Sequence, residues 1–316
     1  MGNTGPCNVN RSYVKHLTDS FCTVKHTNKY VAVAEAVWKL LLCDVVVVSG
    51  VSNKGCILMK IAELLGKKSA YIMHGCVEYE TQINKLSNME RDISQEAYLL
   101  EHADLLLPVS RKFMHWVHAR YPHYADKTKY LHNGIDLGLI PEHRSEEKKP
   151  NSVIAAGGSR PQKRNDVLAA AVESMAGKAR LEIYGGVNSK TADKHYQYVC
   201  YMGKVPQKEF VQSMAQSELF VVNSILESFS LAAVEALLCG CSVLISEMCG
   251  VRDLLDLEEN DMIHEPSDVN EIRNKIGFLL ENPNHDRLMS KLDLDKWSYQ
   301  KSVERLEELC RELART

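Results

Sequence analysis

The chain has 316 residues, of which 45% are apolar and 25% charged, and its formal net charge is −3. This composition is typical of a folded globular protein with room for two domains, and it excludes a disordered or fibrous chain. The slightly acidic balance gives no reason to expect nucleic-acid binding, and no uncharged apolar run reaches the roughly 18 residues that a transmembrane helix needs.

The first half of the chain alternates between helical and strand patterns. Apolar residues recur at helical spacing in some segments, and continuous apolar runs of strand length lie between them, as expected for a parallel sheet buried on both faces. The loops are short, so the pattern predicts a doubly wound α/β domain. Helices are predicted at 8–17, 29–43, 54–66, 84–102 and 111–121, and strands at 44–49, 69–74, 104–109 and 127–132.

A charged stretch at 142–150 predicts an inter-domain loop, and the strand–helix alternation resumes at Ser152. The chain closes with an amphipathic helix at 297–313. Its ten cysteines are scattered, mostly in apolar runs such as those holding Cys43, Cys200, Cys239 and Cys241, without a C-x-x-C pair. With no signal-peptide core at the N-terminus, these thiols are predicted to be buried and reduced in a cytosolic protein.

Residues 219–246 hold the most informative pattern of the second half. An apolar strand is followed by Glu227, a helix of small residues that opens just after it and carries Glu235, and a second apolar run after Gly240. A helix N-terminus offers unpaired N–H groups to phosphates, so a ligand with hydroxyls at both ends and a diphosphate between them would fit. Solvated surface acids are the alternative interpretation of two glutamates eight residues apart.

This segment resembles the E-x7-E signature of retaining, nucleotide-sugar-dependent glycosyltransferases of family four, which have the GT-B fold. The resemblance implies that Glu227 contacts the transferred sugar and that Glu235 binds the ribose. It also implies that backbone N–H groups of Ser228, Phe229, Ser230 and Leu231 face the phosphates. Ser230 stands where the family usually has glycine.

A basic pair for the donor diphosphate is implied by the resemblance of residues 152–166. Lys163 falls on the family lysine, but the place of the family arginine holds Gly158, and Arg160 follows two residues later. Arg160 and Lys163 are therefore assigned to the diphosphate, with a solvated surface turn as the alternative. The Asn133-Gly134-Ile135-Asp136 segment is similar to the family motif at the crossing into the second domain, and Asn133 is assigned to the donor site.

Weaker likenesses follow in the family's order, at 181–186, 201–205, 250–255 and 262–268, so the resemblance covers nearly all of 133–316. At the other end, residues 1–11 resemble the family's glycine loop before its first helix, which assigns Gly5 to the donor. The strand that should precede this loop is not recognisable, and either a short natural start or a truncated chain would explain that. His74 ends a predicted strand, and the resemblance implies that it lies by the sugar and acceptor; a hydrogen-bonded loop histidine is the alternative.

Two other motifs have less support. Gly50 and Gly55 have P-loop spacing without the Lys-Ser/Thr that grips phosphate, and no G-x-G-x-x-G follows a strand. Asp293 and Asp295 form a D-x-D in a polar stretch, which favours a solvated surface over a metal site.

The sequence thus predicts a GT-B α/β protein with two Rossmann-like, doubly wound parallel-sheet domains facing a cleft. The domains are 1–136 and 137–296, and the helix at about 297–316 packs back on the first. The expected activity is retaining transfer of a hexosyl unit from a nucleotide diphosphate sugar to a glycan, lipid-linked or other acceptor, in surface polysaccharide synthesis.

No metal or cofactor is required on this hypothesis. The expected location is the cytoplasm, with peripheral contact at the inner face of the membrane. A nucleotide-sugar epimerase of the same fold and a nucleotide-sugar-binding pseudoenzyme are the alternatives.

Overall fold

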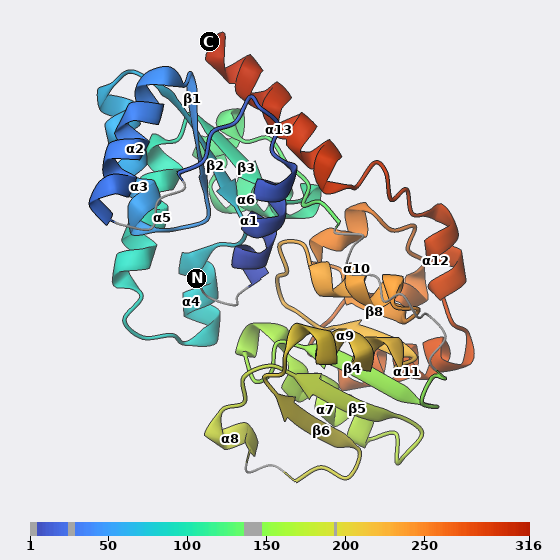
Figure 1. Cartoon of the computed structure of the whole chain (residues 1–316). Coiled ribbons are helices and arrows are strands. Elements are labelled where there is room, and N and C mark those ends of the chain that lie inside the picture. Colours follow the sequence, from blue (N-terminus) through green and yellow to red (C-terminus); the bar gives the residue numbers. More distant parts are fainter. Residues whose placement is uncertain (1–4, 25–28, 136–146, 193–194) are drawn as a thin grey trace. The chain divides into compact units, whose positions relative to one another are not determined.

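The computed structural model describes residues 5–24, 29–135, 147–192 and 195–316. The chain divides into two compact units, of which unit 1 is Met1–Asp136 with Leu294–Thr316 and unit 2 is Leu137–Asp293 (Figure 1). Asp136 and most of the predicted loop at 142–150 lie outside the described residues. None of the helices in the described ranges combines the length and apolar character needed to cross a membrane.

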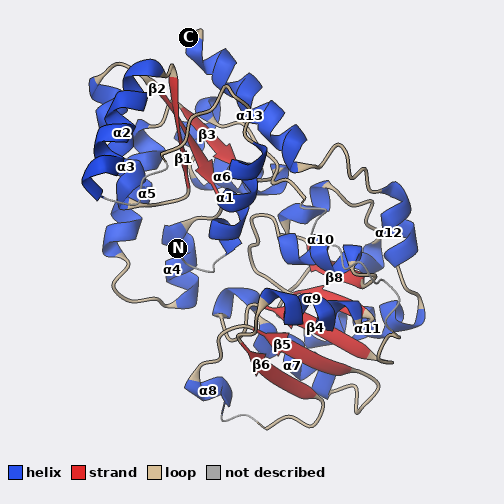
Figure 2. Cartoon of the chain, viewed as in Figure 1, coloured by secondary structure: helices blue, strands red, loops and turns tan. Residues whose placement is uncertain are grey.

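Unit 1 is built on a parallel sheet of three strands in the order β1-β2-β3. Continuous apolar runs form these strands, as the sequence predicts, and helices join them (Figure 2). Helix α3 packs on β1 and β2 and also contacts α5, while α13 from the end of the chain contacts β1, β2 and α1. The elements of this unit are α1 Gly5–His16, α2 Lys29–Leu42, β1 Val45–Ser49, α3 Asn53–Leu64, β2 Lys68–Met73, α4 Val77–Asn84, α5 Glu90–His102, β3 Leu105–Pro108, α6 Arg111–Arg120, the 3-10 helix η1 Pro122–Lys127 and α13 Tyr299–Ala314.

The two separate stretches of unit 1 are joined by a buried contact. The hydroxyls of Tyr13 in α1 and Ser302 in α13 lie 2.6 Å apart beside the carbonyl oxygen of His132. Gly134 leaves room for the start of α13, because a Cβ at this position would stand 2.3 Å from the Cα of Tyr299. Gly134 therefore lets residues 133–135 lie close against the last part of the chain, where the Ile135 amide donates to the Trp297 carbonyl at 2.8 Å.

Two half-buried histidines of unit 1 make acid destabilising. Burial lowers the pKa of His74 to about 4, and burial with nearby Lys296 and Arg305 lowers the pKa of His132 to about 4. An unfolded histidine has a pKa of about 6.5. Between these values the unfolded chain binds protons that the folded chain does not, so stability is complete above about pH 6.5 and falls as the pH approaches 4.

We expect a change from pH 7.5 to pH 5 to lower the free energy of unfolding of unit 1 by about 2 kcal/mol for each of these histidines. All three tryptophans belong to unit 1, so tryptophan fluorescence during urea unfolding reports on this unit. In the double variant His74→Asn, His132→Asn, the free energy of unfolding should change less between pH 7.5 and pH 5. If the free energy of unfolding fell equally in the wild type and the double variant, these histidines would not be the cause of the acid destabilisation.

Two elements predicted in unit 1 differ from the structure. The helix expected at 84–102 begins only at Glu90, because Lys85 and Asn88 adopt left-handed backbone conformations with φ of 50° and 60°, and the separate helix α4 ends at Asn84. The strand expected at 127–132 is an extended segment that pairs with β3 through alternate residues only. Its amide groups at Lys129 and Leu131 donate to Leu106 and Pro108, each at 2.9 Å.

Unit 2 is built on six parallel strands in the order β6-β5-β4-β7-β8-β9. This is the doubly wound arrangement in which strand order reverses at the centre of the sheet, here between β4 and β7. The elements are β4 Ser152–Ala156, η3 Pro161–Lys163, α7 Asn165–Glu173, β5 Arg180–Tyr184, α8 Ser189–Ala192, β6 Val199–Gly203, α9 Gln207–Ala215, β7 Leu219–Val222, α10 Leu231–Leu238, β8 Ser242–Ser246, η4 Gly250–Asp253, η5 Glu259–Asp261, β9 Met262–Ile263, α11 Val269–Glu281 and α12 His285–Lys291.

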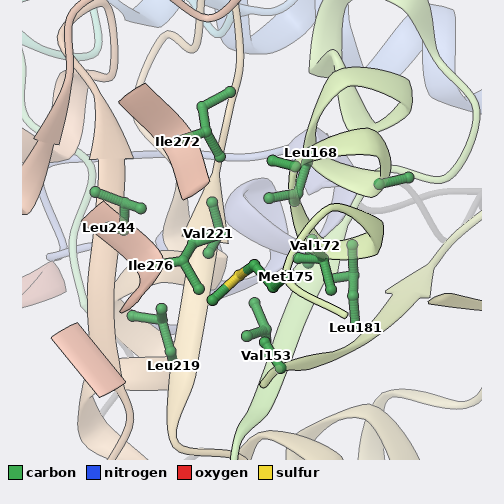
Figure 3. Packing of buried hydrophobic residues seen from close by; sticks show 14 of the residues in the cluster. Val153, Leu168, Val172, Met175, Leu181, Leu219, Val221, Leu244, Ile272 and Ile276 are labelled. Carbon is green, nitrogen blue, oxygen red and sulfur yellow. The ribbon is translucent and has the colours of Figure 1, made fainter. Parts of the chain in front are cut away.

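The core of unit 2 lies between its sheet and the helices α7 and α11 (Figure 3). Leu168 and Val172 from α7 and Ile272 and Ile276 from α11 are fully buried against alternate residues of the central strands. Helix α10 contacts β7 and β8 and also the helices α9 and α12. Close packing of this kind holds the strand ends, and therefore the loops that follow them, in fixed positions.

Two details of unit 2 correct the sequence prediction. Helix α10 begins at Leu231, not directly after Glu227, so Glu227 lies in a loop. Cys200 is exposed, because it lies on the outward side of the edge strand β6. The nine cysteines whose side chains the structure describes are free thiols.

Candidate functional site

The loops after β4 and β7 meet at the point where the strand order of unit 2 reverses. Open α/β sheets bind ligands outside the carboxyl ends of their strands at this point. The loop after β4 carries Lys163, and the loop after β7 carries Glu227. The sheet topology therefore brings together two residues that are 64 positions apart in the sequence.

The ammonium group of Lys163 forms an ion pair with Oε2 of Glu227. The two side chains are 13% and 17% exposed, so the pair is largely shielded yet open to a ligand. The Ser224 hydroxyl lies 3.5 Å from the same carboxylate oxygen. A cation and an acid held at the edge of water can be shared with an incoming ligand, the cation with phosphate and the carboxylate with hydroxyl groups.

Backbone hydrogen bonds hold the loop that carries Glu227 on both sides. The Glu227 amide donates to Met248 at 3.0 Å, and its carbonyl accepts from Gly250 at 2.9 Å. From the other side, the buried side chain of Gln162 donates to the Leu226 carbonyl at 2.8 Å. These contacts fix the acid before any ligand binds, which is the preorganisation that charge stabilisation needs.

Two glycines shape the loop after β4. At Gly157 a Cβ would stand 2.6 Å from the side chain of Lys163, so the absence of a side chain at this position lets the Lys163 side chain pass close to the backbone. Gly158 has a φ of +58°, and a Cβ there would stand 2.1 Å from the carbonyl oxygen of Gly186. Arg160 is exposed, with its Nε donating to the Gly157 carbonyl at 3.3 Å.

Helix α10 presents its N-terminus on the same side as the Glu227 loop. Phe229 is buried and its carbonyl accepts from the Val251 amide at 2.7 Å, while Ser228 and Leu231 are half-buried. Ser230 precedes the helix with a φ of +80°, a conformation that glycine adopts more easily. Glu235 lies inside the helix and is half-buried.

We expect Ser230→Gly to raise the free energy of unfolding of unit 2 by about 1 kcal/mol, because the left-handed conformation costs a residue with a Cβ about that much. Thermal unfolding of the two proteins measures the change. Ala232→Gly, inside the first turn of α10, is the matched control and should instead lower stability by about 1 kcal/mol. A destabilised Ser230→Gly variant would mean that the serine side chain matters more than its backbone strain.

The remaining predicted site residues belong to unit 1. His74 directly follows β2, and its Nε2 lies 2.8 Å from the Ser49 hydroxyl. Gly5 is the first residue of α1 and not part of a loop ahead of it. Asn133 is 4% exposed and directly precedes Gly134.

Two residues at this site were not predicted. Asn223 follows β7 and is buried, and its amide donates to the carbonyls of Arg164 and Pro266 at 3.1 and 3.0 Å. Gln162 ties the two loops together, as described above. The signal in the sequence is their place, since each polar residue stands just beyond a buried strand or beside a site residue.

Parts of the chain match known proteins in sequence. Residues 139–292, which make up nearly all of unit 2, match the family model described as Glycosyl transferases group 1. A curated relative in Campylobacter jejuni is the N-acetylgalactosamine-N,N'-diacetylbacillosaminyl-diphospho-undecaprenol 4-alpha-N-acetylgalactosaminyltransferase. The two are 24% identical over 231 residues, which is 70% of this chain and 63% of that protein.

Solved structures resemble the chain over most of its length. HepE of Anabaena in complex with UDP and glucose has a TM-score of 0.66 at 17% identity, and the match covers 90% of this chain and 82% of the HepE chain. Sucrose-phosphate synthase of Thermosynechococcus elongatus has a TM-score of 0.64 at 18% identity, and the match covers 92% of this chain and 80% of the synthase chain. The pneumococcal O-GlcNAc transferase GtfA, in complex with UDP and GlcNAc, has a TM-score of 0.63 at 17% identity, and the match covers 89% of this chain and 60% of the GtfA chain. The predicted GT-B fold is confirmed.

Proposed function

We propose that this protein is a retaining glycosyltransferase that moves a hexosyl unit from a nucleotide diphosphate sugar to an acceptor. The observation that carries the proposal is the Lys163–Glu227 ion pair at the point where the strand order of unit 2 reverses. Its two groups have the chemistry that the two halves of such a donor need, a cation for the diphosphate and a carboxylate for sugar hydroxyls. The match of 139–292 to group 1 glycosyl transferases supports the same activity.

In the proposed reaction the bond from the sugar to the diphosphate breaks and a bond to the acceptor oxygen forms. Negative charge develops on the leaving diphosphate, where Lys163, with Arg160 and Gly158 on the same loop, would stabilise it. The N–H groups from Ser228 to Leu231, in the last residues before α10 and at its first residue, would add to this. Glu227 would orient the sugar and Glu235 the ribose, while the leaving phosphate takes the acceptor proton.

The residues of unit 1 are assigned to the sugar and the acceptor. His74 would contact a hydroxyl of the sugar or acceptor, and Gly5 and Asn133 remain proposed donor contacts. The Campylobacter relative is named for a diphospho-undecaprenol acceptor, which supports a lipid-linked glycan as the acceptor class. Such an acceptor would place the protein in the cytoplasm with peripheral contact at the inner face of the membrane, in surface polysaccharide synthesis.

The test incubates the protein with UDP-, GDP- and ADP-sugars and measures free nucleoside diphosphate, first alone and then with lipid-linked acceptor fractions. Release from one donor, absent in Glu227→Ala, is the expected result. Retention is read from the anomeric configuration of the product. Isomerised donor without release would favour an epimerase. Donor binding without release in any mixture would favour a binding protein.

A further inference from the structure

Three residues of unit 1 form a short hydrogen-bonded chain that ends at His74. Ser49 is the last residue of β1, and its register partner in β2 is Ile72. Because side chains alternate along strands, Ser49, Ile72 and His74 share one face of the sheet. The Ser49 Oγ lies 2.6 Å from Oδ1 of Asn10 in α1 and 2.8 Å from Nε2 of His74.

The direction of these hydrogen bonds decides where the proton of the imidazole sits. A serine hydroxyl carries one proton, and the Oδ1 of Asn10 can only accept, so the Ser49 hydroxyl donates to Asn10. The oxygen of Ser49 then faces Nε2 with a lone pair, which requires a proton on Nε2. Burial favours the neutral ring by lowering its pKa to about 4. In a neutral imidazole with a proton on Nε2, Nδ1 carries the lone pair.

We propose that Asn10 and Ser49 are positioning residues that hold His74 as its Nε2–H tautomer, so that Nδ1 is a hydrogen-bond acceptor. Any group that Nδ1 contacts must then donate a hydrogen bond. A hydroxyl of a sugar or acceptor could donate such a hydrogen bond, but a deprotonated phosphate oxygen could not. This reading of the ligand rests on the proposed function, whereas the tautomer itself does not.

The tautomer can be measured without any substrate. Long-range ¹H–¹⁵N spectra of the ¹⁵N-histidine-labelled protein at pH 7.5 should show a protonated Nε2 and an unprotonated Nδ1 for His74, assigned by comparison with His74→Gln. Ser49→Ala should lose this single form and give averaged shifts for the two nitrogens. A protonated Nδ1 in the wild-type protein would overturn the proposal.

Asn10→Asp tests the direction of the chain. A carboxylate accepts hydrogen bonds and cannot donate them, so the Ser49 proton should still point to residue 10 and the Nε2–H tautomer should remain. If Asn10 instead donated to Ser49, the Ser49 hydroxyl would donate to Nε2 and the wild-type proton would be on Nδ1. The aspartate variant would then reverse the chain and move the proton from Nδ1 to Nε2. That reversal would overturn the proposal.

Turnover provides a second and separate measurement. Ser49→Ala should lower kcat about 10- to 100-fold with little change in the donor KM, because a misplaced hydrogen-bonding group costs the transition state more than the ground state. Ser49→Thr keeps the hydroxyl, so it should restore most of the rate. Unchanged kcat in Ser49→Ala would overturn the positioning role. The expected tautomer without turnover of any donor would instead count against the proposed function alone.

Discussion

Lys163→Ala is expected to lower kcat/KM for the nucleotide-sugar donor about 10²- to 10³-fold, the usual cost of removing one preorganised charge-stabilising group. The lysine is the cation held in the site, and its loss also leaves the Glu227 carboxylate without its partner. That carboxylate would then repel the diphosphate. Steady-state measurement of nucleoside diphosphate release gives kcat and KM separately.

The ion pair between Lys163 and Glu227 leads to a second prediction for the same site. Because Lys163 and Glu227 act on each other, the double variant Lys163→Ala, Glu227→Ala should lose less than the product of the two single losses. Lys178→Ala removes an exposed lysine of unit 2 away from these loops and should leave kcat/KM unchanged. A Lys163→Ala enzyme within about threefold of the wild type would remove the lysine from the mechanism.

Gly158→Ala is expected to lower the free energy of unfolding of unit 2 by about 3 kcal/mol and to weaken donor binding. The alanine would bear the cost of a left-handed backbone, about 1 kcal/mol, and its Cβ would press on the carbonyl oxygen of Gly186. Both strand-end loops would have to move apart, and Lys163 would move with the first of them. Chemical unfolding followed by far-UV circular dichroism measures the first effect, and titration with UDP, GDP and ADP the second.

Gly203→Ala is the matched control for this substitution. Gly203 also belongs to unit 2 and has a φ of +74°, but nothing lies within 4 Å of a Cβ built on it. Gly203→Ala should therefore lower the free energy of unfolding only by the cost of the left-handed backbone, about 1 kcal/mol. Equal losses in the two variants would show that the contact with Gly186 does not matter. The same contact explains why an arginine could not stand at position 158 in this loop, although the resemblance would place one there.

The parts of the site that could be predicted are those that depend on strand ends. Apolar runs predicted the strands of unit 2, and parallel strands bring their carboxyl ends to one edge, whereas the family resemblance assigned Lys163 and Glu227 to the donor site at that edge. Their ion pair was not expected, because the sequence assigns each of them to a different part of the ligand. Pairing depends on side-chain directions that only the packed loops determine.

The parts that could not be predicted depend on local backbone conformation or on distant contacts. Lys85 and Asn88 end one helix and precede another through left-handed conformations that the helical pattern of 84–102 conceals. The later start of α10 follows from the conformation of Ser230. The contact of Ser49 with His74 and Asn10 joins three elements, and no spacing along the chain predicts it.

The return of α13 to unit 1 has a consequence for the order in which the protein can fold as it is synthesised. Unit 2 is one continuous stretch, so it can fold as soon as that stretch has left the ribosome. Tyr13 of unit 1 must wait for Ser302, 289 residues later. At ordinary rates of translation the wait is about 15 to 60 s. The unit that is synthesised first is therefore completed last, and its β1 and β2 strands lack the cover of α13 throughout that time.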